Sequence, residues 1–269
     1  MGHSTSATLL AMVRAEVEAR TGEPASARSK RALLDLLTRP DEAFDVGRAI
    51  RGRADHPVLS TVTNAPTAAS VLARWQSIEA FGHTKHRTRT LGIADGTLEV
   101  EHVCVDGEPI AEAEHQFVWG LLAGLLERWG SPRVEVSSPQ RATTTLSWAP
   151  RAATLPSQWV ESAHVRDAVA RILETDVARS WTVAEVAARL GTSPRSLQRS
   201  LRSDGSTFSE RLQRARLDVA MSLLRADRLS LTEIAFCSGF ADQAHFSRVC
   251  RKRFDVPPTA LKALLDAEA

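Results

Sequence analysis

The chain has 269 residues, of which 43% are hydrophobic, and this is enough for two domains with cores of their own. The formal net charge is only +2, which argues against a protein that coats polyanions without selectivity. The longest apolar run, 117–126, is about half of the roughly 20 residues that span a membrane. The N-terminus has no basic start followed by an apolar core, and the cysteines follow no pairing pattern. The sequence therefore predicts a cytoplasmic protein without a secretory signal or membrane contact.

The first part of the chain mixes helix-like and strand-like patterns. Apolar residues at helical spacing predict helices over 7–20, 27–37, 41–51, 67–78 and 109–129. Alternating residues on either side of Asp95-Gly96 predict a β-hairpin over 87–93 and 97–105. Further strands are expected over 134–137 and 143–148. This order of elements predicts an α+β N-terminal domain over residues 1–148.

Several groups in this domain allow two interpretations. The apolar stripe of the helix over 109–129 either packs against the hairpin or forms a dimer face. The tryptophans either fill the core or line an apolar effector pocket. Four residues could meet near the hairpin and hold a metal: His83, His86, His102 and Cys104. Their spacing matches no recognised metal site, so no metal is expected.

No catalytic set stands out in the sequence. Glu112, Glu114 and His115 resemble fragments of one, but a His-Glu-x-x-His pattern is absent. A glycine-rich phosphate loop and a Gly-x-Ser-x-Gly elbow are absent as well. The sequence therefore predicts no catalytic residue and no cofactor, and it argues against an enzyme.

A segment over 149–160 contains Pro150 and Pro156, interrupts the periodicity and predicts a linker. The domain expected after it, 161–269, contains one local pattern twice, over 181–201 and 229–253. Each copy has a hydroxyl residue, a glutamate, a small alanine in an apolar turn, a glycine and then a basic helix. This order is typical of a helix-turn-helix, so the sequence predicts an all-α domain with two such motifs.

The two motifs have recognisable helix ends. Thr182 with Glu185, and Ser230 with Glu233, predict capping boxes, and Gly191 and Gly239 can take the positive φ that ends a helix. A linker helix is expected over 207–225, about 28 Å long at 1.5 Å per residue. That length is near the roughly 34 Å between successive major-groove segments on one face of B-DNA.

Polar side chains on the second helix of each motif are the candidate DNA contacts, because arginine and glutamine hydrogen-bond guanine and adenine edges. In the first motif they are Arg195, Ser196, Gln198, Arg199 and Arg202. In the second motif they are Gln243, His245, Arg248, Arg251 and Lys252. The sequence thus predicts double-stranded DNA as a partner.

The stretch over about 165–265 resembles the DNA-binding domain of the AraC/XylS family of bacterial transcription regulators. The matching segments are 216–224, 231–235, 239–240, 245–248 and 254–259. The sequence departs from the family pattern at Cys250, Asp255 and Leu261-Lys262, which are packing positions rather than base-reading ones. The resemblance implies seven helices, with the two motifs on either side of the linker helix.

The N-terminal domain shows a looser resemblance, over about 33–148, to the effector domain of ornithine-utilisation-type members of the same family. The combined reading is a sequence-specific transcription regulator that responds to a small-molecule effector through residues 1–148. A second copy of the chain, as in a homodimer, and RNA polymerase are further expected partners. The alternatives are a ligand-independent regulator whose N-terminal domain only dimerises, and an enzyme with a fused DNA-binding domain.

Overall fold

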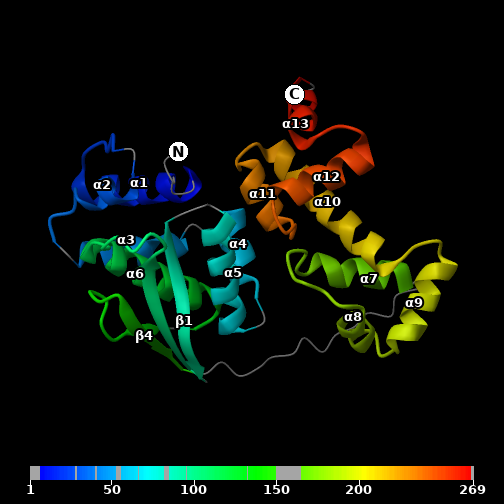
Figure 1. Cartoon of the computed structure of the whole chain (residues 1–269), viewed down its shortest axis with the longest axis horizontal. Coiled ribbons are helices and arrows are strands. Elements are labelled where there is room, and N and C mark those ends of the chain that lie inside the picture. The colour runs from blue at the N-terminus through cyan, green and yellow to red at the C-terminus, as the bar shows by residue number, and fades with distance from the viewer. Residues whose placement is uncertain are drawn as a thin grey trace. The chain divides into compact units, whose positions relative to one another are not determined.

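The computed structural model describes residues 7–27, 29–39, 41–52, 56–65, 67–81, 85–94, 96–131, 133–149 and 165–267 (Figure 1). Internal contacts divide the chain into two units, Met1–Ala153 and Thr154–Ala269, and each unit has a core of its own. The predicted linker, 149–160, lies outside the described residues except for Ala149. The assignment of roles to 1–148 and 161–269 therefore stays a prediction.

The N-terminal unit has the expected α+β architecture. Its helices are α1 (Ala7–Thr21), α2 (Lys30–Leu34), α3 (Glu42–Ala49), the 3-10 turn η1 (Ile50–Gly52), α4 (Pro57–Thr63), α5 (Ala68–Phe81) and α6 (Glu112–Trp129). Its strands are β1 (His86–Ala94), β2 (Thr97–Cys104), β3 (Val134–Val136) and β4 (Thr143–Trp148). They form an antiparallel sheet in the order β1-β2-β4-β3, and the expected hairpin is present as β1 and β2.

Two short helices differ from the sequence-based expectation. α2 covers five residues rather than 27–37, because the Ser29 side chain accepts the Ala32 N–H and starts the helix late. The sequence pattern did not predict α4, because its seven residues are too few to show a helical period. Its start is fixed by Pro57 at the first position and by His56, whose Nδ1 accepts the Val58 N–H at 3.3 Å.

Helix α6 is the centre of the N-terminal core. Every residue from Glu114 to Leu126 is buried, and α6 contacts α2, α3, α4, α5 and β3. The predicted apolar stripe consists of Phe117, Leu121, Leu125 and Trp129; the first three are at most 1% exposed, and Trp129, at the end of the helix, is half-buried. Most of the stripe is therefore core, which argues against its interpretation as a dimer face.

The crossing of α3 and α6 depends on glycine. A Cβ atom on Gly120 would overlap the Phe44 carbonyl oxygen and lie 2.8 Å from its carbon. A Cβ on Gly47 would overlap the Phe117 carbonyl oxygen and lie 2.8 Å from the Leu121 nitrogen. Both glycines face the opposite helix, so the two backbones touch directly and leave no room for a side chain.

An ion-pair cluster stabilises the C-terminal end of α6. The carboxylate of Glu127 is only 4% exposed and binds both Arg48 and Arg51. It also accepts the Val134 N–H at 3.1 Å, which ties β3 to the same point. The buried charge is thus paired and hydrogen-bonded, as a buried carboxylate must be.

The C-terminal unit is all-helical over 165–267, and the resemblance correctly implied its seven helices. They are α7 (Val165–Glu174), α8 (Val183–Arg189), α9 (Pro194–Ser203), α10 (Phe208–Ala226), α11 (Leu231–Cys237), α12 (Gln243–Phe254) and α13 (Pro258–Ala267). Buried residues of α7, α8 and α9 form one cluster around Trp181. The two helix-turn-helix motifs are α8–α9 and α11–α12.

The linker helix α10 begins at the Thr207 cap and ends at Ala226, close to the predicted 207–225. Its most buried residues are Leu217, Ala220 and Leu224. Phe208, Leu212 and Ala215 are half-buried and pack against the core cluster of the first motif. Helix α10 also contacts α7, α11 and α13, so its packing residues are spread over more than one face.

Candidate nucleic-acid interface and a cavity in the N-terminal unit

Local hydrogen bonds build the first motif. Thr182 Oγ1 accepts the Glu185 N–H at 3.2 Å, and the Glu185 carboxylate accepts the Thr182 N–H at 2.8 Å, which confirms the capping box. These hydrogen bonds from Thr182 lower the pKa of Glu185 and keep the cap charged. Gly191, at φ +64°, makes the turn, and Ser193 then accepts the Ser196 N–H to start α9.

Helix α9 presents one polar face. Leu197 and Leu201 are fully buried against the core cluster. The exposed side chains on the opposite face are Arg195, Gln198, Arg199 and Arg202. Ser196 is half-buried, and its hydroxyl accepts a hydrogen bond from Ser193 at 2.9 Å. The structure thus brings four of the five predicted contacts together on one open surface and places Ser196 at the cap.

The second motif repeats this construction. Ser230 Oγ accepts the Glu233 N–H at 3.3 Å, and Glu233 accepts the Ser230 N–H at 2.9 Å, which confirms the second capping box. Gly239, at φ +76°, makes the turn. Asp242 then caps α12 by accepting the His245 N–H at 2.6 Å. Both motifs therefore start their recognition helix from a capped turn.

Internal contacts orient two of the predicted contacts on α12. Gln243 Oε1 accepts the Thr232 hydroxyl at 2.9 Å. His245 is half-buried; its Nδ1 accepts the Ala241 N–H at 3.3 Å and its ring stands edge-on to Phe240 at 5.4 Å. The exposed basic residues of this helix are Arg248, Arg251, Lys252 and Arg253. Internal contacts thus hold Gln243 and His245 at the start of α12, and exposed basic residues follow them.

Arg216 on α10 connects the two motifs. Its guanidinium donates to the carbonyls of Val177 and Arg179 at 3.4 and 3.2 Å, in the loop before the first motif. The turn glycine of the second motif, Gly239, lies against the same loop: a Cβ there would sit 2.7 Å from the Val177 oxygen. These contacts fix the second motif relative to the first, which a linker helix alone would not do.

A stacked tryptophan also supports the first motif, and sequence reasoning missed it. The guanidinium groups of Arg179 and Arg189 lie 4.6 and 4.5 Å from the ring of Trp181. The Trp181 indole N–H donates to the Asp176 carbonyl at 2.8 Å. Arg179 also pairs with Glu185 at 2.5 Å. Basic residues on both sides of a tryptophan are the available signal, because arginine stacks readily on aromatic rings.

The departures from the family pattern fit the packing. Cys250 is fully buried, and burial raises the pKa of its thiol to about 11, so it behaves as a small apolar side chain. Asp255 takes the left-handed conformation, φ 62°, at the end of α12, where a glycine would be less strained. Lys262 pairs with Asp227, which ends α10 in the same conformation. The departures thus concern packing and helix ends rather than the exposed basic faces.

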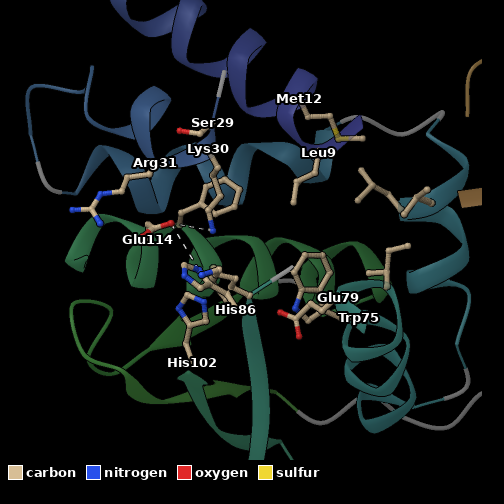
Figure 2. A pocket seen from close by; sticks show the side chains of 16 residues that line it. Leu9, Met12, Ser29, Lys30, Arg31, Trp75, Glu79, His86, His102 and Glu114 are labelled. Carbon is tan, nitrogen blue, oxygen red and sulfur yellow. Dashed lines mark ion pairs between the residues drawn. The ribbon is translucent and has the colours of Figure 1, made fainter. Parts of the chain in front are cut away.

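A cavity of about 250 Å³ opens within the N-terminal unit (Figure 2). Its apolar lining residues are Leu9, Met12, Val58, Leu59, Trp75, Ile78, Phe117 and Val118. Its polar lining residues are Ser29, Lys30, Arg31, Glu79, Lys85, His86, His102 and Glu114. Figure 2 shows Lys30, Arg31, His86, His102 and Glu114 together at one end, the polar end, with Leu9, Met12 and Trp75 at the other and Glu79 beside Trp75. These residues come from α1, α2, α4, α5, β1, β2, α6 and the segments before α2 and β1, so no single stretch of sequence reveals the cavity.

The polar end is organised around Lys30. Its ammonium lies 3.6 Å from Glu114 Oε1 and 5.4 Å from the centre of the Phe117 ring. His86 Nδ1 lies 3.8 Å from the same Glu114 oxygen, and dashed lines in Figure 2 join this carboxylate to both Lys30 and His86. Burial lowers the pKa of Lys30, with Glu114 opposing the shift. Burial raises the pKa of Glu79, the second acid of the cavity.

Three histidines lie next to one another below this site. The rings of His86 and His102 are 5.0 Å apart, as are those of His102 and His115, and the last two approach through their Nδ1 atoms at 3.1 Å. Burial and the positive charge of Lys30 lower the pKa of His102 to about 2. Burial is also the main cause that lowers the pKa of His86 and of His115. The cluster is therefore neutral at ordinary pH.

The metal candidates of the sequence are partly dispersed. His83 lies outside the described residues, and Cys104 is half-buried at the end of β2. Among the described residues, no group of three or more His, Cys, Asp or Glu side chains is arranged to hold a metal ion. Likewise, none of the helices in the described ranges is long and apolar enough to cross a membrane.

Comparisons with known proteins concentrate on the C-terminal unit. Residues 186–263 match the family model described as a helix-turn-helix domain. The HTH-type transcriptional activator RhaS of Klebsiella pneumoniae is 41% identical over 96 residues, which cover 35% of this chain and 34% of RhaS. The TCP pilus virulence regulatory protein of Vibrio cholerae is 29% identical over 98 residues, 36% of each chain. The chain thus spans about a third of the length of these relatives.

Among solved structures, a DNA-binding transcriptional dual regulator from Escherichia coli K-12 is similar with a TM-score of 0.39 and 24% identity. The match covers 41% of this chain and 99% of that one. The family model and these transcription regulators support the resemblance of the C-terminal unit to the AraC/XylS family. Its two motifs and linker helix have the order that the family resemblance implied.

Proposed function

We propose that this chain is a sequence-specific DNA-binding regulator of transcription, controlled by a small molecule that binds the N-terminal unit. The observation that carries the DNA-binding role is the pair of capped recognition helices, α9 and α12, with open basic side chains. They are joined by a helix about 28 Å long and locked by Arg216, so they can face successive major-groove segments about 34 Å apart.

The proposed contacts divide into two kinds. Arg195, Gln198 and Arg199 lie on α9 before its last turn, where side chains can reach base edges. Arg251 and Lys252 lie in the last turn of α12, where phosphates are the nearer partners. Double-stranded DNA is thus the proposed partner of both helices, with RNA polymerase and a second copy of the chain as further proposed partners.

The first prediction tests base reading. Gln198→Ala or Arg199→Ala is expected to weaken operator binding by about 1–3 kcal/mol and to relax base preference at one half of the site, because bidentate contacts to bases are lost. Selection of binding sites from a random DNA pool by each variant measures this. Ser200→Ala, beside them but half-buried, is the control. An unchanged selected motif in both variants would remove these two residues from the proposed readers.

The second prediction tests positioning. Neutralising Arg251 and Lys252 together is expected to weaken binding to all DNA sequences alike. The slope of log affinity against log salt should flatten by about two, since each phosphate contact contributes nearly one unit. Fluorescence anisotropy over a salt series, on one selected and one scrambled duplex, measures both quantities. A loss confined to the selected duplex, with an unchanged slope, would contradict the phosphate role.

A further inference from the structure

The cavity of the N-terminal unit has an apolar and a polar part, as a site for an amphipathic ligand would. Its polar part offers few hydrogen-bond acceptors to the Lys30 ammonium. An ammonium group carries three donors. The Lys30 side chain is 12% exposed, and the one ion pair that the described residues offer it is to Glu114 at 3.6 Å, longer than a hydrogen bond. A buried charge of this kind is costly unless it is paired and hydrogen-bonded. Lys30 is therefore able to accept an anion.

The acids of the cavity are already engaged. Glu79 Oε2 accepts the Thr88 N–H at 2.9 Å, and its Oε1 accepts the Thr88 hydroxyl at 2.8 Å. Glu114 faces both Lys30 and His86. A cationic ligand would therefore have to displace existing partners of these two carboxylates.

The charged groups that face the cavity favour an anion over a cation. The cationic side chains among its lining residues are Lys30, Arg31 and Lys85, whereas His86 and His102, whose pKa values burial lowers, add no positive charge. The acidic ones are Glu79 and Glu114. Lys85 is already bound by Asp106 at 2.7 Å and is 44% exposed, so it lies at the rim. Lys30, with His86 beside it, is the basic group best placed for a buried anion.

The remainder of the cavity is suited to an apolar body. Trp75, Ile78 and Leu59 are buried and line the cavity together with Leu9 and Met12 of α1. Figure 2 shows Leu9, Met12 and Trp75 on the opposite side of the cavity from Arg31 and Glu114. Phe117, which is also buried, lies 5.4 Å from the Lys30 ammonium. The cavity volume of about 250 Å³ is close to the lower limit of the usual range for small-molecule sites. A small ligand can bury an apolar body here and present one charged end to Lys30.

We propose that this cavity binds a monocarboxylic acid with an apolar body of medium length, whose carboxylate is received by Lys30 with His86 beside it. The inference rests on the proposed function in that it names the chemical class of the small molecule that controls the regulator. The binding itself is independent of DNA and can be measured without it.

The test is isothermal titration calorimetry of the full chain, without DNA, against three probes of one length: octanoate, octan-1-ol and octylamine. Octanoate is expected to bind best, octan-1-ol about tenfold or more weakly because the charged contact is missing, and octylamine least. Butanoate, which fills less of the apolar end, is expected to bind more weakly than octanoate. Octylamine binding more tightly than octanoate, or no binding of any acid, would overturn the assignment.

Variants separate the two ends of the cavity. Lys30→Met is expected to weaken octanoate by about tenfold or more and to leave octan-1-ol little changed, whereas Lys30→Arg should retain most of the affinity for octanoate. Lys85→Met is the matched control, because this lysine lines the same cavity but is exposed and paired with Asp106. Val58→Phe, which fills the apolar end and keeps Lys30, should weaken both probes alike.

The results of these experiments distinguish the proposed ligand class from the proposed function as a DNA-binding regulator. Equal octanoate affinity for Lys30→Met and Lys85→Met would overturn the role of Lys30, whatever the DNA results are. Octanoate binding that depends on Lys30, in a protein that selects no DNA sequence, would support the ligand class and refute the regulator. Thermal unfolding of each variant shows whether it is folded. If Lys30→Met does not fold, octanoate and octan-1-ol binding by Lys30→Arg and Val58→Phe still tests the charged contact and the apolar part of the cavity.

Discussion

Gly120→Ala is expected to destabilise the N-terminal unit by about 3 kcal/mol or more, which is large compared with the total stability of a domain. The added methyl group would overlap the Phe44 carbonyl oxygen and lie 3.1 Å from the Arg48 nitrogen, so α3 and α6 must move apart along their crossing. Alanine is the better helix former by about 1 kcal/mol, but that gain is smaller than the cost of separating two packed backbones.

The control for this prediction is Gly52→Ala, at the end of η1. A Cβ there meets nothing within 4 Å, so the substitution should change stability by less than about 1 kcal/mol. Urea unfolding of the full chain, followed by tryptophan fluorescence, measures both variants. The glycine contact would not be essential if Gly120→Ala unfolds at the same urea concentration as the original chain and Gly52→Ala.

The helix-turn-helix motifs could be predicted from the sequence because their signals are local. Each cap joins residues three positions apart, as in Thr182 with Glu185, and each turn depends on the backbone freedom of one glycine. Alternating burial on α9 follows from the helical period alone, which placed Leu197 inward and Gln198 outward. Local rules of this kind need no knowledge of the rest of the fold.

The connection between the two motifs could not be predicted in the same way. Arg216 was counted as part of the family signature and not as the residue that binds the Val177 and Arg179 carbonyls. That role depends on how α10 packs against the loop before α8, far away in sequence. Gly239 likewise has a predicted role, its positive φ, and an unpredicted one, its close approach to the same loop.

The cavity shows the same limit of sequence reasoning. His83, His86, His102 and Cys104 were grouped as metal candidates because the predicted hairpin could bring them together, and His115 was assigned to a different group. The structure instead places the ring of His102 edge-on to both His86 and His115, beside a lysine that lies on α2. Side chains from separate helices and strands meet only after the sheet packs on α6, so spacing along the chain gave no sign of it.

Acidification is expected to destabilise the N-terminal unit through His102. Its pKa is lowered from 6.5 to about 2 in the folded chain, by burial first and then by Lys30, His86 and His115. Below pH 6.5 the unfolded chain binds a proton that the folded chain does not, so stability decreases as the pH falls. The decrease approaches about 1.4 kcal/mol per pH unit, or about 2 kcal/mol between pH 6.5 and 5.

The other shifted groups have predictable signs. His86 and His115 also have lowered pKa values, so they act in the same direction as His102. Glu79 has a raised pKa and acts in the opposite direction, because between 4.5 and its folded pKa the folded chain binds more protons than the unfolded one. The contribution of His102 must therefore be isolated by comparing two chains rather than read from one pH profile.

The comparison is between the original chain and His102→Asn, whose side chain does not titrate and can still hydrogen-bond His115. Urea unfolding at pH 7.5, 6.5, 5.5 and 5.0 should show a shallower loss of stability on acidification for the variant, by about 1 kcal/mol or more per pH unit below 6.5. His245→Asn, in the C-terminal unit, should leave the pH dependence of the N-terminal unit unchanged. Parallel profiles for the original chain and His102→Asn would mean that His102 takes up a proton without unfolding, and that the cavity is wetter than its side-chain burial indicates.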